Sequence, residues 1–268
     1  RDMAYAVQAE SQEEVLKLIF KAVEMSGNKN VVLSGGYALN CVANYWYLDK
    51  LNKENISLYV EPVSSDAGTA LGAALLTYHS LTKDKTVRDY AETIYEGFEY
   101  HYSLMDVDST AEKYGATVVD ADHEKVVGII RDKNIVALWQ GKSENGPRAL
   151  GNRSLLFDPT IQDGKDHVNR VKRREYFRPF AGTILLEHAH EWFDMKGLEQ
   201  SPHMMFAMDC KEGVAEKIPS IIHVDGTCRI QTVTKKQNIL YYEIIEEFYK
   251  QSGVPIIFNT SFNLEVNH

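Results

Sequence analysis

The sequence predicts an α/β fold over its first part and an α+β fold over its second, on the basis of three observations. Over residues 1–85, short apolar runs alternate with longer segments of helical periodicity. A charged and tyrosine-rich stretch without a clear period then interrupts this alternation. Beyond it, several short strand candidates follow one another. We therefore expect one domain over 1–85, a connection at 86–100 and a second domain over 101–268.

The composition is that of an ordinary globular chain. Of its 268 residues, 44% are hydrophobic and 25% are charged. No run of eighteen apolar residues occurs, so we expect no membrane partner, and no leader indicates secretion. Cys41, Cys210 and Cys228 are far apart and lack CxxC spacing, which is typical of a reducing compartment and favours the cytoplasm. A net charge of −9 argues against a nucleic-acid partner.

In the first part, we expect a helix from about Ser11, because Ser11 and Glu14 have the spacing of a capping box. The apolar residues after it fall on one helical face, and Gly27 is a suitable stop. The elements expected next are a buried strand at 31–33, a helix at 37–48, a strand at 56–60, and a helix that opens at 64–69 and runs to about residue 80.

In the second part, a helix near 123–131 precedes a strand at 135–139 that leads to Gly141. A helix is expected at 162–174, and an amphipathic helix at 239–251 ends at Gly253. The remaining strand candidates are 183–186, 204–208, 221–224, 229–233 and 255–258.

The strongest functional signal is a basic island at 141–180, which holds nine Lys and Arg residues against five Asp and Glu residues. Its charges are interleaved with turn residues, as in Gly146-Pro147-Arg148 and Gly151-Asn152-Arg153. Such turns can aim guanidinium groups at one anion, and arginine is suited to bidentate grips on phosphate or carboxylate. A surface ion-pair network is the alternative. The run RVKRRE is also compatible with a nuclear signal or an RNA patch.

Four further features have both a functional and a local interpretation. Ser34-Gly35-Gly36 lies between a strand and a helix, where it can admit a nucleotide phosphate or form a tight turn. Asp66 can ligate a metal or cap a helix. The stretch from His223 to Arg229 contains an Asp-Gly step typical of a hairpin turn, so both ends can face one pocket. The cluster NTSFN at 259–263 suits a polar ligand or a turn.

Six blocks, taken together and in order, resemble the NodU/CmcH family of O-carbamoyltransferases, which includes the tobramycin carbamoyltransferase. GPRALGNRS and KRREYFRPFA are the most specific stretches. The six blocks are LSGGYALNCVAN, EPVSSDAGTALGAAL, ENGPRALGNRSLLFDP, VNRVKRREYFRPFAGTIL, HVDGTCRIQTV and VPIIFNTSFN.

The resemblance implies that residues 1–85 are the last portion of an actin-like ATPase (ASKHA-type) domain related to threonylcarbamoyltransferases. It implies a YrdC-like domain over 101–268, cut short at its end. In such enzymes the YrdC-like domain forms carbamoyl adenylate from carbamoyl phosphate and ATP. The other module, with a divalent metal such as iron, passes the carbamoyl group to a hydroxyl of a sugar or antibiotic. The chain ends are those expected of a piece of a longer protein, and a homodimer is compatible with the family.

The family resemblance also implies roles for individual residues. Asp66 matches a metal-ligating aspartate whose partner ligands are expected upstream of this chain, so we expect no complete metal site here. Gly35, Gly36 and Asn40 are expected to line the nucleotide cleft of the first module. The catalytic residues implied are Arg148, Arg178, His223 and Arg229. The substrate-binding residues implied are Asn152, Arg153, Lys172, Arg173, Arg174, Thr227, Asn259, Ser261 and Asn263.

Two departures from the family pattern stand out, and two rival functions stay open. The family continues after Asn263 with a Gly-Glu-Pro segment, whereas this chain ends in LEVNH. Tyr37 replaces a small apolar residue after the glycine pair. The rivals are a non-catalytic module that binds a phosphorylated or nucleic-acid partner, and a small-molecule kinase of the actin-like superfamily.

Overall fold

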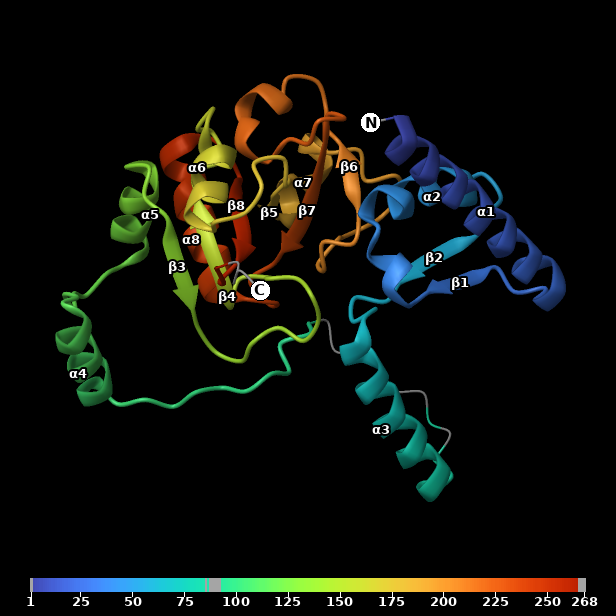
Figure 1. Cartoon of the computed structure of the whole chain (residues 1–268), viewed down its shortest axis with the longest axis horizontal. Helices are drawn as coiled ribbons and strands as arrows, with labels where there is room; N and C mark the ends of the chain where they lie inside the picture. The colour runs from blue at the N-terminus through green and yellow to red at the C-terminus, as the bar shows by residue number, and fades with distance from the viewer. Residues whose placement is uncertain (1, 85, 87–92, 265–268) are drawn as a thin grey trace.

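The computed structural model describes residues 2–84, 86 and 93–264, and shows a first α/β unit packed against a larger unit built on a mixed sheet (Figure 1). In the first unit, β1 and β2 pair in parallel through Asn30–Ser57 to Leu33–Val60. Its elements are α1 (Asp2–Ser26), β1 (Asn30–Leu33), the 3-10 turn η1 (Gly36–Leu39), α2 (Cys41–Asn52), β2 (Ser57–Val60) and α3 (Asp66–Thr82).

The start of α1 corrects the prediction made from the sequence. The helix begins at Asp2, and the Ser11 hydroxyl donates to the carbonyl of Gln8 at 3.0 Å inside it, so the capping box at Ser11 is wrong. Residues 2–10 contain no Gly or Pro, so nothing stops the helix from extending toward the N-terminus. The predicted helix at 37–48 is divided, because Asn40 caps α2 by accepting from the amide of Ala43 at 3.1 Å.

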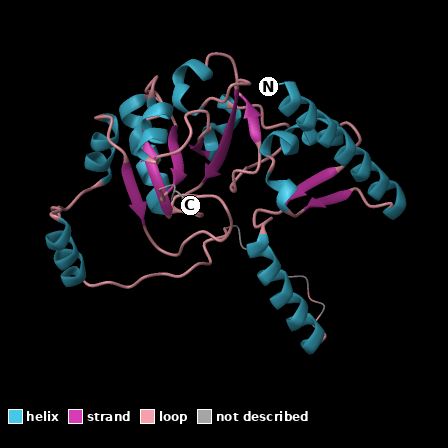
Figure 2. Ribbon diagram, in the orientation of Figure 1, coloured by secondary structure: helices cyan, strands magenta, loops and turns pink. Residues whose placement is uncertain are grey.

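The larger unit is built on a sheet whose strands are magenta in Figure 2. The sheet has six strands in the order β3-β4-β8-β5-β7-β6, in which β5 and β7 are parallel and the other pairs are antiparallel. Its strands are β3 (Val136–Trp139), β4 (Arg153–Phe157), β5 (Ala181–Leu185), β6 (Ala207–Asp209), β7 (Thr227–Val233) and β8 (Ile256–Ser261). Its helices are α4 (Leu104–Tyr114), α5 (His123–Arg131), α6 (Gly164–Val171), α7 (Leu186–Trp192) and α8 (Ile239–Ser252), with 3-10 turns η2 (Ala215–Lys217) and η3 (Pro219–Ile221).

Strand β4 was not predicted, although it lies between β3 and β8 and its residues Leu155, Leu156 and Phe157 are buried. Turn-forming and charged residues lie on both sides of this short apolar run, so the sequence pattern did not indicate a strand there. The strand predicted at 221–224 is wrong, because Pro219 opens a 3-10 turn there and the chain then turns at Asp225-Gly226. Proline has no amide hydrogen to give to a strand ladder.

The two units share one core and several hydrogen bonds. Tyr45 and Leu48 of α2 belong to the same buried cluster as the apolar residues of the large sheet. The side-chain amide of Asn44 donates to the carbonyl of Met205 at 2.9 Å, and the Tyr45 hydroxyl donates to the carbonyl of Asp194 at 2.9 Å. Helix α2 therefore fixes the first unit against the second. Helix α3, in contrast, projects away from the rest of the first unit and from the large unit, and it buries no residue (Figure 1).

Within the described part of the chain, every helix is too short or too polar to span a lipid bilayer.

The buried imidazole of His203 leads to a prediction about the stability of the fold at acid pH. Burial lowers the pKa of its imidazole from 6.5 to about 4, and its Nε2 has no hydrogen-bond partner among the described residues. The unfolded chain therefore binds more protons than the folded chain between pH 4 and 6.5, and stability falls as the pH drops through this window, by about 3 kcal/mol at most. The burial of His223 lowers its pKa and acts in the same direction.

Urea unfolding at intervals from pH 4.5 to 7.5 measures this effect. We expect His203→Gln to flatten the pH dependence relative to the unsubstituted chain. An equal slope in both proteins would show that His203 does not titrate in this range.

Candidate functional site

A pocket of about 460 Å³ lies where loops of the basic island meet the ends of β7 and β8. Arg229 of β7 and Asn259 of β8 both pair with Ala181 of β5, which lies between them. Residues opposite one another in a sheet point to the same face, so Arg229 and Asn259 flank one floor. The lining residues are Pro147, Arg148, Ala149, Arg174, Phe177, Arg178, Pro179, Met204, Arg229, Asn259, Thr260 and Ser261.

Among the described residues, the lining includes four arginines and no Asp or Glu. Burial, and then the nearby charge of Arg229, lowers the pKa of Arg148. The Nε atoms of Arg148 and Arg229 are buried without a hydrogen-bond partner among the described residues. Oδ1 of Asn259 is also buried without a hydrogen-bond partner among the described residues. The Nδ2 of Asn259 donates to the carbonyl of Ala149 and to the hydroxyl of Thr183, at 3.1 Å each. Buried donors left unpaired are costly, so this arrangement calls for an anionic ligand.

Arg148 is held in position by the first unit. Its Nη2 lies 3.1 Å from the carbonyl oxygen of Leu39, to which it donates, and 3.4 Å from Sγ of Cys41. Cys41 is itself buried, and its thiol lies 3.4 Å from the carbonyl of Met204 on the pocket wall. The junction between η1 and α2 therefore sets the direction of a pocket arginine.

Cys41→Ala should weaken anion binding about 2- to 10-fold, because it removes one hydrogen-bond acceptor from Arg148. Cys41→Ser should retain most of the affinity, since a hydroxyl also accepts. Calorimetric titration with inorganic phosphate as the probe anion measures both, with Cys210→Ala as the control outside the pocket. Equal affinity of all three variants would mean that Cys41 does not position Arg148.

The two rim arginines are anchored differently. Arg178 donates through Nε to Glu175 at 2.6 Å, and both side chains are about half exposed. This hydrogen bond lowers the pKa of Glu175. Arg174 donates through Nε to Oδ1 of Asn169 at 2.8 Å, and its guanidinium lies 4.4 Å from the ring centre of Phe180. Arg174 is thus fixed by buried residues, whereas Arg178 can exchange its surface partner for a ligand.

Several cations and amides that the sequence placed in the site hold the loops instead. Lys172 is buried, and its Nζ donates to the carbonyl and side chain of Asn263 at 2.7 and 3.0 Å. Arg153 donates to the carbonyl of Gln140 at 2.6 Å and lies over the ring of Trp139 at 3.9 Å. These contacts, with those of Asn152 to the carbonyl of Lys142, tie together the walls of the pocket without lining it.

Arg173, His223 and Thr227 also lie outside the pocket lining. Arg173 is exposed, with a φ of 56°. His223 contacts the carbonyl of Phe180 through Nε2 at 3.0 Å and the hydroxyl of Thr227 through Nδ1 at 3.2 Å. Burial, followed by the charge of Arg229, outweighs the hydrogen bond to Phe180 and lowers the pKa of His223. A neutral His223 therefore braces the turn before β7, beside Arg229.

The candidate residues of the first unit are spread over separate places. Gly35 lines a second pocket of about 280 Å³ with residues of α3, and Gly36 opens η1. Asn40 caps α2 and exchanges hydrogen bonds with Gln8. Asp66 is exposed at the start of α3. The described residues contain no group of three His, Cys, Asp or Glu side chains able to hold a metal ion. The side chains present around Asp66 therefore do not fit a metal site.

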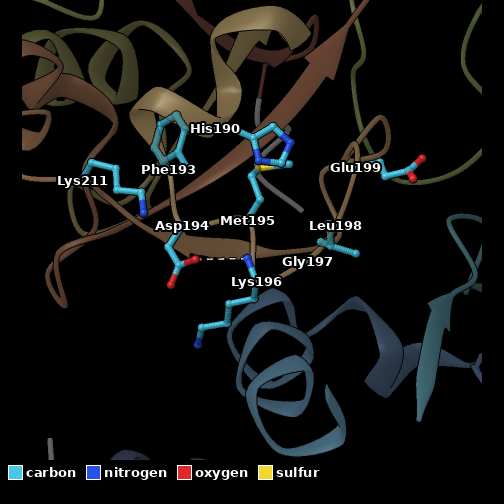
Figure 3. Close-up of a pocket in the computed structure, with 9 residues that line it drawn as sticks. All are labelled: His190, Phe193, Asp194, Met195, Lys196, Gly197, Leu198, Glu199 and Lys211. Atoms are coloured by element: carbon cyan, nitrogen blue, oxygen red, sulfur yellow. Dashed lines mark hydrogen bonds between the residues drawn. The ribbon is translucent and has the colours of Figure 1, made fainter. Parts of the chain in front are cut away.

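A third pocket, of about 330 Å³, lies beside α2 and differs in chemistry (Figure 3). Its cations Lys196 and Lys211 share the wall with the carboxylates of Asp194 and Glu199. Lys196 also lies over the ring of Tyr45 at 3.7 Å, where its charge is already engaged. Since its charges are mixed, this pocket is less suited to an anion than the arginine-lined one.

Sequence reasoning named six of the twelve residues that line the pocket, and Phe177 and Met204 are among the six that it did not name. It also missed Asn169 and Cys41, which position pocket arginines. Phe177 lies within the quoted motif KRREYFRPFA, so its place among the arginines was the available signal. The six named residues that line the pocket are Arg148, Arg174, Arg178, Arg229, Asn259 and Ser261.

Fold and pocket together describe an α/β protein with an arginine-lined pocket at the edge of its large sheet. The model of the carbamoyltransferase C-terminus matches residues 127–267, and that of the carbamoyltransferase N-terminus matches residues 1–75. The chain therefore belongs to the carbamoyltransferase family.

Relatives with known names support the assignment across nearly the whole chain. The chain is 36% identical to the nodulation protein NolNO of Sinorhizobium fredii, over 99% of this chain and 39% of that protein. It is 34% identical to the nodulation protein NolO of Bradyrhizobium diazoefficiens, over 96% of this chain and 48% of that protein. The chain thus spans less than half the length of these relatives.

Among solved structures, full-length HypF in its phosphate- and nucleotide-bound form is similar with a TM-score of 0.40 and 17% identity. The match covers 56% of this chain and 18% of that chain, which is too little to support an argument about the site.

Proposed function

We propose that this chain carries the adenylate-forming part of an ATP-dependent O-carbamoyltransferase, with the arginine-lined pocket as the site for carbamoyl phosphate and ATP. Carbamoyl phosphate releases inorganic phosphate with water as the co-reactant, and the carbamate oxygen then attacks the α-phosphorus of ATP. Pyrophosphate leaves, and carbamoyl adenylate remains. In the finer fold assignment, the large unit is YrdC-like and the first unit is the end of an actin-like domain.

The observation that carries this proposal is the set of unpaired buried atoms in the pocket, namely Nε of Arg148, Nε of Arg229 and Oδ1 of Asn259. Both substrates are polyanions whose phosphate oxygens can accept from the two arginines. Donors fixed in advance and shielded from water stabilise the charge that builds up on the attacked phosphorus. The half-exposed Arg178 at the rim, which now donates to Glu175, can contribute a further contact to the phosphates.

The carbamoyl group is proposed to pass to a hydroxyl of a small molecule. Two relatives are called nodulation proteins, and the family is that of the carbamoyltransferases. The described residues do not assemble a metal site, so no step in this scheme passes through a metal.

The direct test is exchange of labelled pyrophosphate into ATP in the presence of carbamoyl phosphate. We expect exchange that requires both substrates. Formation of ADP instead of AMP would indicate a small-molecule kinase. Salt-sensitive RNA binding without any response to carbamoyl phosphate would indicate a non-catalytic binding module and overturn the proposal.

A further inference from the structure

The rim of the arginine-lined pocket carries an aromatic side chain that the proposed chemistry has not used. Phe177 lines the pocket and is 65% exposed. Its neighbour Tyr176 is 75% exposed and meets it edge to ring at 5.9 Å between centroids, but does not line the pocket. Single exposed apolar residues are common on protein surfaces. What distinguishes Phe177 is that its ring lines a pocket together with four arginines.

The turn that carries Phe177 is held in place by one buried side chain, that of Asn169. Asn169 of α6 is 1% exposed, and its Nδ2 donates to the carbonyls of Tyr176 at 3.3 Å and Arg178 at 3.1 Å. These carbonyls belong to the residues on either side of Phe177. Through Oδ1, the same amide accepts from Arg174 at 2.8 Å. One buried amide therefore fixes both the backbone around Phe177 and a pocket arginine.

The ligand that this arrangement fits has a polyanionic part and a flat aromatic part. Arg148, Arg174, Arg178 and Arg229 face the anion, and the exposed ring beside them offers a surface on which a base can stack. Base–aromatic stacking tolerates any base, because every base has a π-face. An aromatic ring held in advance loses little conformational entropy when the base arrives.

We propose that Phe177 forms the nucleobase subsite of this pocket and that Asn169 is the residue that positions it. This inference rests on the proposed function, since it assigns the base of ATP to Phe177 and the phosphates to the arginines. Binding places the base on the Phe177 ring at the rim, with the triphosphate directed inward to Arg148 and Arg229.

Calorimetry with two probes, ATP and inorganic triphosphate, tests the subsite, because only ATP carries a base. We expect Phe177→Ala to weaken ATP binding about tenfold and to leave triphosphate binding unchanged. Phe177→Trp should preserve ATP affinity, whereas Phe177→Leu, which is apolar but has no ring, should lose most of it. Tyr176→Ala is the matched control and should bind both probes as the unsubstituted chain does. Arg178→Ala should weaken both probes.

The outcomes separate the two proposals. If the unsubstituted chain binds ATP and Phe177→Ala binds it equally well, the subsite assignment is wrong and the proposed function stands. Equal weakening of both probes by Phe177→Ala would show a structural role for the ring, which also overturns the assignment. If the unsubstituted chain binds neither probe, the proposed function fails and the subsite with it.

Asn169 has a separate test. Asn169→Leu keeps the size but removes both hydrogen bonds that hold the turn, so ATP affinity should fall while circular dichroism and the unfolding midpoint report whether the fold persists. Asn169→Asp keeps the acceptor for Arg174 and loses the donors to the carbonyls, so it should share the loss. ATP binding at full strength by a folded Asn169→Leu would exclude the positioning role.

Discussion

Replacing Arg148 with alanine is expected to lower the rate of carbamoyl-phosphate-dependent ATP–pyrophosphate exchange by about 10²- to 10³-fold. Arg148 lines the pocket, and its Nε atom is buried without a partner among the described residues, so in the proposed reaction this group meets the developing negative charge. Losing such a donor from a site shielded from water removes about 2.7–4 kcal/mol of transition-state stabilisation.

Arg170→Ala is the control for this experiment. Arg170 belongs to the same basic island and is exposed on α6, outside the pocket lining. If charge density alone mattered, both variants would lose similar activity. If the pocket is the site, Arg170→Ala keeps nearly full exchange. A near-normal rate for Arg148→Ala, with the variant folded, would mean that the buried arginines form a structural network instead.

Gly151→Ala is expected to destabilise the fold by about 3 kcal/mol or more. Gly151 has φ +109°, in a region that L side chains rarely adopt. A Cβ at this position would lie 2.1 Å from Cδ1 of Tyr241, which is a buried ring of α8 and cannot retreat without disturbing the core. The hydroxyl of Tyr241 donates to Thr183 at 2.8 Å, so moving the ring also breaks a buried hydrogen bond.

Urea unfolding measures this loss, and Gly213→Ala separates its two causes. Gly213 has φ +74° but nothing within 4 Å of the added Cβ, so only the backbone strain applies there, about 1 kcal/mol. A larger loss for Gly151→Ala than for Gly213→Ala is the expected result. Equal losses would show that the Tyr241 ring moves aside freely.

Much of the fold followed from local sequence patterns. The strands at 30–33, 57–60, 136–139, 181–185 and 227–233 lie close to where short apolar runs predicted them, and α8 ends at Gly253 with φ +71° as its stop signal indicated. These elements could be predicted because their signals lie within a few residues. Strand β4 and the start of α1 could not, because their signals compete with turn residues in one case and with a cap-like Ser11 in the other.

The functional residues divide in a similar way. The sequence alone identified the basic island, the six family motifs and an anion as the expected ligand class. It could not say which cations face that anion, because Arg148, Arg153 and Lys172 look equally suitable in the chain. The tertiary structure separates them. Arg148 lines the pocket, whereas Arg153 and Lys172 use their donors on carbonyl oxygens of neighbouring loops.

The register of the sheet determines which residues from outside the basic island reach the pocket. Arg229 and Asn259 are distant from the basic island in sequence, yet both pair with Ala181 on β5 and so lie beside the island's loops. The contact of Arg148 with Leu39 and Cys41 likewise depends on how α2 packs against the large unit. The sequence by itself determined the chemistry that the protein has available. Only the tertiary structure decided which groups are left unpaired at one point, because burial and hydrogen-bond competition are properties of packing and not of the local chain.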